Sequence, residues 1–224
     1  MYDDPACMTT RVKICCMGSV EESRIAIRHG ASAVGVVSAM PSGPGVIGDR
    51  LIAEIVRHVP PGVATFLLTS RQSAAEIIDQ LRRSGAGTIQ ICDRVEIECY
   101  EALRAEMPGV KIVQVIHVSG MSSIDEARAA AGYADALLLD SGNQSLPIKE
   151  LGGTGRVHDW RVSRAIVEAV EIPVYLAGGL NPSNVGEAIR AVRPFGVDVC
   201  SGLRTHGKLD EIKVKHFFEQ VKAA

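Results

Sequence analysis

Two cysteines and an aspartate stand where the sequence could support proton-transfer chemistry. Cys15 ends the apolar run VKIC and Cys16 follows it directly, while Asp140 closes a second apolar run, ADALLLD. A thiolate can take a proton and a carboxyl group can donate one when both reach the same pocket. Asp140 alone has two interpretations, because it could instead cap the loop that follows it.

Glycine-rich turns form a second group of candidates. They are GGTG at 152–155, GGLNPSN at 178–184 and SGL at 201–203. Glycine lets the backbone approach a phosphate closely, and a helix beginning near Asn181 would add N-terminal amides and a favourable dipole. The turns therefore predict a phosphorylated ligand, with ordinary tight turns as the alternative.

The other cysteines and the histidines do not indicate a metal site. The six cysteines show neither CxxC spacing nor a zinc-like grouping with histidine. We expect Cys16 to be a structural thiol and His117 and His158 to be hydrogen-bonded structural residues. Trp160 is expected to pack against the core, and the aspartate before it to cap a helix.

Length and composition restrict the class of protein. The chain has 224 residues, 46% hydrophobic and 22% charged, which is enough for a full-sized core, so we expect one domain over 1–224 with a short tail at 1–10. A net charge of −2 without a basic run argues against a nucleic-acid partner. Because the sequence shows neither an apolar leader nor a membrane-length apolar window, we expect no membrane association and a cytoplasmic location.

Strands and helices alternate along the chain and must position the candidate residues. The β-branched runs are largely apolar, as is typical of a parallel sheet covered on both faces. Eight strands are expected, at 12–15, 33–37, 64–68, 88–92, 111–116, 134–140, 173–178 and 196–200. A segment with helical periodicity follows each of them. Eight such pairs favour a (β/α)8 TIM barrel over an open doubly wound sheet.

A barrel would bring the candidates together. Reacting groups in this fold lie at the carboxyl ends of the strands, and phosphate often binds in the loops after strands seven and eight. Cys15, Asp140 and the glycine-rich turns all follow strands. We therefore expect them at one end of the barrel.

The motifs, in their order, resemble the phosphoribosylanthranilate isomerase family, whose members carry out an Amadori rearrangement in tryptophan biosynthesis. The resemblance rests on KIC, LLLD, GGTG followed by DW, GGLNPSNV, and VRP followed by VDVCSG. It spans nearly the whole chain. It implies an isomerase that acts on a small-molecule phosphoribosyl substrate and needs no metal or other cofactor.

The resemblance also implies roles for individual residues. It assigns the general base to Cys15 and the general acid to Asp140. Phosphate binding falls to Gly155, Gly178, Gly179, Ser201 and Gly202. The chemistry agrees, because an acid must open the aminoaldose ring and a base must then remove the C2′ proton.

The chain departs from the family after the second strand. The family has Ser-Pro-Arg there, with an arginine for the anthranilate carboxylate, whereas this chain reads SAMPSGPGVIGD. The next arginine, Arg50, is expected on the following helix and facing away. We expect Arg204 or Arg156 to replace the missing substrate-binding cation. PSGPG is interpreted as a structural turn, with an anion-binding nest of amides as the alternative.

Three functions remain open from the sequence. The first is phosphoribosylanthranilate isomerase, and the second is an aldose–ketose isomerase acting on another phosphoribosyl amine. The third is a barrel that binds a sugar phosphate without catalysis, which the presence of both Cys15 and Asp140 disfavours. The oligomeric state is not determined by the sequence.

Overall fold

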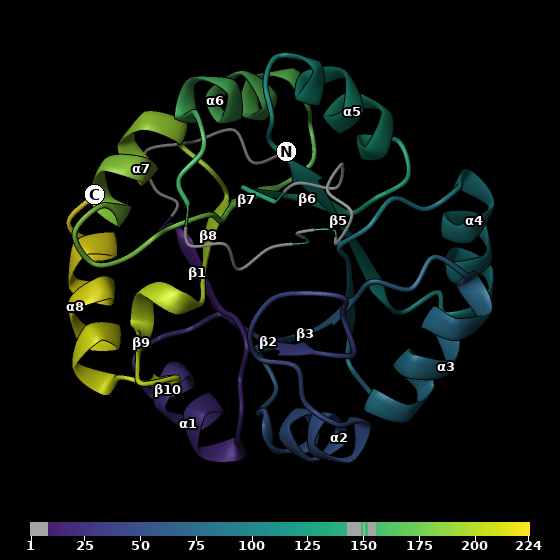
Figure 1. The fold of residues 1–224 in the computed structure, drawn as a ribbon, viewed down its shortest axis with the longest axis horizontal. Coiled ribbons are helices and arrows are strands. Elements are labelled where there is room, and N and C mark those ends of the chain that lie inside the picture. The colour runs from purple at the N-terminus through teal and green to yellow at the C-terminus, as the bar shows by residue number, and fades with distance from the viewer. Residues whose placement is uncertain (1–8, 143–148, 150, 152–155) are drawn as a thin grey trace.

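Eight parallel strands alternate with eight helices in the part of the chain that the computed structural model describes, residues 9–142, 149, 151 and 156–224 (Figure 1). The strands are β1 (Arg11–Ile14), β2 (Ala33–Val37), β3 (Ala64–Thr69), β4 (Thr88–Ile91), β5 (Lys111–His117), β6 (Ala136–Asp140), β7 (Val174–Leu176) and β8 (Gly196–Val199). The helices are α1 (Val20–Arg28), α2 (Asp49–His58), α3 (Ala74–Ser84), α4 (Ile97–Glu106), α5 (Ser122–Ala131), α6 (Trp160–Ala169), α7 (Val185–Val192) and α8 (Glu211–Lys222).

The strands form a closed barrel in sequence order, because β8 pairs in parallel with β1. Figure 1 shows the helices as a ring around the strands. The predicted (β/α)8 barrel is confirmed, and the open doubly wound sheet is excluded. The sequence did not predict the short 3-10 helix Ser201–Leu203 or the hairpin of β9 (Arg204–Thr205) and β10 (Lys208–Leu209) that precede α8.

Two apolar layers hold the barrel together. Outward-facing strand residues such as Ile14 and Val199 pack with the helices in one large cluster. Inward-facing residues such as Phe66, Leu138 and Tyr175 form a second cluster inside the barrel. Because both faces of every strand are covered, the apolar runs of the sequence do not alternate with polar residues as they would in a half-exposed sheet.

Side-chain caps mark the N-termini of α1, α6 and α8. The side chain of Ser19 accepts a hydrogen bond from the backbone N–H of Glu22 at the start of α1. Asp159 caps α6 and Asp210 caps α8 in the same manner. Such caps satisfy N–H groups that have no partner within the helix. Each cap places the first turn of its helix next to the loop that leaves the barrel mouth.

A buried ion pair lies inside the barrel where it closes. Lys13 on β1 faces Asp198 on β8, and the Lys13 Nζ atom lies 2.8 Å from Asp198 Oδ2. Lys13 is fully buried, and its ammonium also lies 5.2 Å from the centroid of the Phe66 ring. Burial alone disfavours the ammonium, but Asp198 outweighs it and raises the pKa of Lys13. Each charge therefore depends on the other.

Removal of one member of this pair should destabilise the barrel strongly. We expect Lys13→Met to lower the free energy of unfolding by about 3–5 kcal/mol, because it leaves the Asp198 carboxylate buried without a counter-charge. Adding Asp198→Leu should recover part of that loss. Urea unfolding monitored by circular dichroism measures all three proteins.

Lys111→Met is the matched control. Lys111 pairs with Asp135 at 3.4 Å but is 67% exposed, so its loss should cost less than about 1 kcal/mol. Equal losses for Lys13→Met and Lys111→Met would show that the interior pair does not stabilise the fold in this way.

Candidate active site

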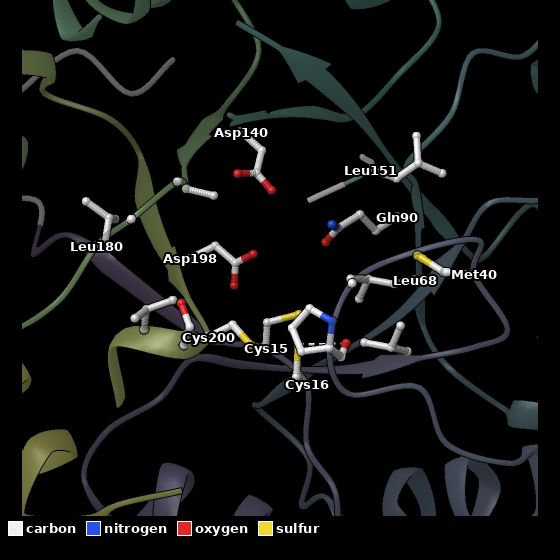
Figure 2. A pocket seen from close by; sticks show the side chains of 18 of the residues that line it. Cys15, Cys16, Met40, Leu68, Gln90, Asp140, Leu151, Leu180, Asp198 and Cys200 are labelled. Carbon is white, nitrogen blue, oxygen red and sulfur yellow. Dashed lines mark hydrogen bonds between the residues drawn. The ribbon is translucent and has the colours of Figure 1, made fainter. Parts of the chain in front are cut away.

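A pocket opens at the carboxyl ends of the strands, where the sequence predicts the reacting groups (Figure 2). Its lining comes from the last residues of β2, β6 and β8, from residues that follow β1, β2, β6, β7 and β8, and from side chains of β3 and β4. The lining residues are Cys15, Cys16, Val37, Met40, Ser42, Gly43, Pro44, Leu68, Gln90, Asp140, Leu151, Ala177, Gly178, Gly179, Leu180, Asp198, Val199, Cys200 and Ser201.

Cys15 continues β1 into the floor of the pocket. Its backbone N–H donates to the carbonyl of Val199 at 2.8 Å, and the residue is only 5% exposed. Gly35 on β2 makes room for the thiol, since a Cβ there would lie 3.0 Å from Cys15 Sγ and 3.2 Å from Lys13 Nζ. The same gap therefore places the Cys15 sulfur close to the buried ammonium.

Asp140 enters the pocket from the end of β6. One carboxylate oxygen, Oδ1, accepts a hydrogen bond of 2.7 Å from the backbone N–H of Ser141. Burial raises the pKa of Asp140, and this outweighs the opposite effect of the Ser141 N–H. A raised carboxyl pKa favours the protonated form, which is the form that can donate a proton.

Two further polar side chains present unused acceptors to the pocket. Asp198 Oδ1 and Gln90 Oε1 are buried and have no hydrogen-bond partner among the described residues. Figure 2 shows both side chains directed toward the same space as Asp140. Buried acceptors normally have a donor, so these atoms are positions at which a ligand hydroxyl or N–H group would be favoured.

The glycine-rich turns after β7 and β8 border the pocket. Gly178 and Gly179 have φ of +84° and +64°, and both lie against the segment that begins at Arg156. A Cβ on Gly179 would lie 2.8 Å from the backbone of Arg156. Ser201 also lines the pocket. Gly202 packs against the carbonyl of Leu180 instead, where a Cβ would come within 2.0 Å.

The structure therefore brings together Cys15, Asp140, Gly178, Gly179 and Ser201, as the sequence predicts for one end of a barrel. Gly155 and the rest of GGTG lie outside the described residues. Close packing accounts for part of the glycine content of the turn after β7, which is the alternative that the sequence left open.

The two arginines proposed as replacement cations do not line this pocket. Arg204 binds the Glu22 carboxylate at 3.0 and 2.9 Å and also donates to the carbonyls of Cys16 and Gly207. Arg156 borders a neighbouring hollow with Ser119. Arg50 lies exposed on α2, as predicted.

Cys16 occupies an unusual backbone conformation. Its φ is +62°, in the left-handed region that favours glycine. Its side chain contacts the loop after β2, with Sγ 3.7 Å from the carbonyl of Pro44, and a Cβ on Gly45 would lie 2.5 Å from the Cys16 Cβ. The Cys16 side chain thus packs directly against the PSGPG turn, in space that the absence of a side chain on Gly45 leaves open.

The three thiols at the mouth influence one another. Hydrogen bonds with Cys15 and Cys200 raise the pKa of Cys16, so this thiol keeps its proton. The hydrogen bond with Cys16, aided by Arg204, lowers the pKa of Cys200. A protonated Cys16 can donate a hydrogen bond but cannot accept a proton, so its assignment as a structural thiol stays the prediction.

His117 and His158 lie outside the pocket lining, and each has a hydrogen-bond partner. His117 Nε2 lies 2.9 Å from the carbonyl of Cys92, and His158 Nε2 lies 2.7 Å from Ser163 Oγ. Burial lowers the pKa of His158 to about 4, so the ring is neutral at pH 7. Trp160 packs against the outer core, as predicted.

Asp198 and Lys13 are the site residues that sequence reasoning missed. Each is a charged residue within an apolar strand, between Val12 and Ile14 or between Val197 and Val199. That isolated charge is a usable signal, because an unpaired buried charge is costly and implies a partner. Their pairing, however, depends on the register of β1 with β8.

Neither a metal-binding cluster nor a membrane-spanning helix is found in the described part of the chain. No group of three His, Cys, Asp or Glu side chains there could hold a metal ion. None of the helices described is long and apolar enough to cross a membrane.

The chain resembles known proteins over almost its whole length. The sequence model of N-(5'-phosphoribosyl)anthranilate (PRA) isomerase matches residues 12–220. N-(5'-phosphoribosyl)anthranilate isomerase 2 of Methanosarcina mazei is 38% identical over 214 residues, which is 95% of this chain and 94% of that protein.

Solved structures agree with that match. Phosphoribosyl anthranilate isomerase from Thermococcus kodakaraensis has a TM-score of 0.80 and 30% identity, with 96% of this chain and 100% of that chain covered. A phosphoribosyl anthranilate isomerase in complex with reduced 1-(o-carboxyphenylamino)-1-deoxyribulose 5-phosphate has a TM-score of 0.79 and 26% identity, with the same coverage.

Replacing Cys16 by glycine should be tolerated. Glycine adopts the left-handed conformation without strain but loses the contact with Pro44, so we expect the free energy of unfolding to change by no more than about 1 kcal/mol. Cys16→Val places a β-branched side chain in that conformation and should cost more, by about 1–3 kcal/mol. Urea unfolding compares the two; a glycine variant less stable than the valine variant would contradict this.

Proposed function

Because the chain belongs to the N-(5'-phosphoribosyl)anthranilate isomerase family, we propose that Cys15 is the general base and Asp140 the general acid of its reaction. The chain is an enzyme of tryptophan biosynthesis that isomerises N-(5'-phosphoribosyl)anthranilate. One observation carries the assignment of roles: a buried thiol and a carboxyl group with a raised pKa face one pocket. That pocket ends in the turns after β7 and β8.

Asp140 acts first, as an acid. The substrate is a cyclic aminoaldose, and the Asp140 carboxyl group donates its proton to the ring oxygen. The C1′–O bond breaks as the amine nitrogen supplies its electron pair, which leaves a protonated Schiff base. The raised pKa of Asp140 keeps this proton available at a pH at which an ordinary carboxyl group would have lost it.

Cys15 acts second, as a base. The Cys15 thiolate removes the C2′ proton, and the electrons of that C–H bond move to the Schiff base and neutralise its nitrogen. The resulting enolamine takes a proton at C1′ while its C2′ hydroxyl loses one, and this gives the ketone. The two protons that move belong to different parts of the sugar, so an acid and a base on opposite walls of the pocket suit the reaction better than a single group.

The substrate phosphate is assigned to the turns after β7 and β8. Gly178, Gly179 and Ser201 line the end of the pocket bordered by these turns. Backbone N–H groups there cost nothing to orient and favour an anion. Gly202 and Gly155 retain the same predicted role, with Gly155 outside the described residues.

The predicted contacts of the anthranilate moiety are Arg156 and Arg204. Substrate contacts for Arg156 and Arg204 stay predictions, and for Arg204 they would require it to exchange or share its ion pair with Glu22. Family membership favours phosphoribosylanthranilate over another phosphoribosyl amine and over a non-catalytic barrel. The cytoplasmic location also stays a prediction.

Substitutions at the acid and the base should separate turnover from binding. We expect Cys15→Ser and Asp140→Asn each to lower kcat by about two orders of magnitude or more, because each group acts in proton transfer in the transition state. KM should change much less. The assay follows the decay of fluorescence of freshly formed phosphoribosylanthranilate.

Cys16→Gly is the control for the choice of thiol. Since Cys16 keeps its proton, this variant should retain most of the activity. An inactive Cys16→Gly enzyme alongside an active Cys15→Ser enzyme would show that the neighbouring thiol is the base.

A charge placed at Ser201 tests the phosphate assignment. We expect Ser201→Asp to weaken binding of inorganic phosphate by about tenfold or more, because a carboxylate beside the bound anion repels it. Ser201→Ala should have a smaller effect, since the backbone groups remain. Isothermal titration calorimetry measures both, and equal affinities for Ser201→Asp and wild type would place the phosphate elsewhere.

A further inference from the structure

The substrate carries a second anion, the carboxylate of its aromatic amine, and the described part of the pocket lining offers it no counter-charge. The described residues that line the pocket include no Lys, Arg or His, and their acidic side chains are Asp140 and Asp198. Burying a carboxylate without a cation or several donors is costly. Either a cation at the rim binds this carboxylate, or the carboxylate stays in solvent.

The position of the aromatic ring follows from the position of the phosphate. Figure 2 shows Met40 and Leu151 on the side of the pocket opposite Leu180 and Cys200, which lie by the turns after β7 and β8. Met40 and Leu151 supply an apolar surface there, and Leu151 is only 4% exposed. A substrate with its phosphate near Ser201 would therefore extend its ring toward Met40 and Leu151.

Lys149 lies at this apolar end. Its carbonyl accepts a hydrogen bond from the hydroxyl of Ser42, a lining residue of the loop after β2. Two positions further along the chain, Leu151 lines the pocket itself. Lys149 is thus fixed at the rim between the loop after β2 and the apolar wall.

The Lys149 ammonium is held but not enclosed. Nζ lies 2.7 Å from Oδ2 of Asp93, which follows β4 and is only 5% exposed, while the Lys149 side chain is 40% exposed. An ammonium has three N–H donors, and Asp93 is its only ion-pair partner among the described residues. Donors remain for an incoming carboxylate.

Other cations near the mouth are less suited. Lys13 is fully buried and paired with Asp198 beneath the reacting groups. Arg204 is only 12% exposed and is held by Glu22 on the α1 side. Lys149 is the described cation joined by hydrogen bonding to the loop that lacks the family's arginine.

From these contacts we propose that Lys149 binds the carboxylate of the substrate's aromatic amine and so determines specificity for an ortho-carboxylated amine. The inference rests on the proposed function of the pocket. Asp93 holds the ammonium at the rim, and the Ser42 hydroxyl holds the Lys149 backbone. The role that the family gives to an arginine after β2, which this chain lacks, is thereby taken by a lysine after β6.

Binding of two matched ligands tests this inference. The first is reduced 1-(o-carboxyphenylamino)-1-deoxyribulose 5-phosphate, and the second is the same compound without its carboxylate. We expect Lys149→Met to weaken binding of the first ligand by about ten- to a hundredfold, because a hydrogen bond to a charged group is lost. The second ligand should lose less than about twofold. Lys149→Arg should restore most of the difference. Isothermal titration calorimetry measures each Kd.

Lys111→Met serves as the control, since Lys111 is an exposed lysine paired with an aspartate at the start of β5. It should leave both affinities unchanged. Equal weakening of both ligands by Lys149→Met, or no weakening of either, would overturn the inference. A selective loss of the carboxylated ligand in Arg156→Met but not in Lys149→Met would assign the role to Arg156. Failure of wild type to bind either ligand would instead overturn the proposed function as well.

Discussion

Pairing of β1 with β8 is the constraint on which the rest of the structure depends. It closes the barrel, and in doing so it places Lys13 beside Asp198 and carries Cys15 and Cys200 to the same side of the mouth. Two charges that would each be unfavourable alone inside the barrel become acceptable as a pair at 2.8 Å. The strand pairing that closes the barrel therefore also forms the floor of the pocket, where the proposed base Cys15 lies.

Cys15 and Asp140 have different electrostatic surroundings within the pocket. The floor holds the Lys13 ammonium close to the Cys15 sulfur, while Asp140 on the opposite wall has its pKa raised by burial. An acid and a base within one low-dielectric space need different surroundings if they are to hold different protonation states at one pH. Here the closing strands place the Lys13 ammonium beside Cys15, the proposed base.

The loop after β2, where the chain departs from the family pattern, contacts two other parts of the barrel mouth. Cys16 has a left-handed backbone and presses its side chain against Pro44 and Gly45, where glycine provides the necessary space. The same loop binds the backbone of Lys149 through Ser42. A change of sequence in this loop is thus accompanied by contacts with both the β1 end and the β6 end of the barrel mouth.

The amino-acid sequence alone determined the barrel, its strand order and the carboxyl-end location of Cys15, Asp140, Gly179 and Ser201, because apolar periodicity and strand ends are local properties of the chain. Only the tertiary structure decided which charges meet: Lys13 with Asp198, Arg204 with Glu22, and Lys149 with Asp93. These partners lie 185, 182 and 56 residues apart, as the difference of their numbers shows. Pairing over such separations depends on barrel register and on loop paths over the mouth, for which no local pattern exists.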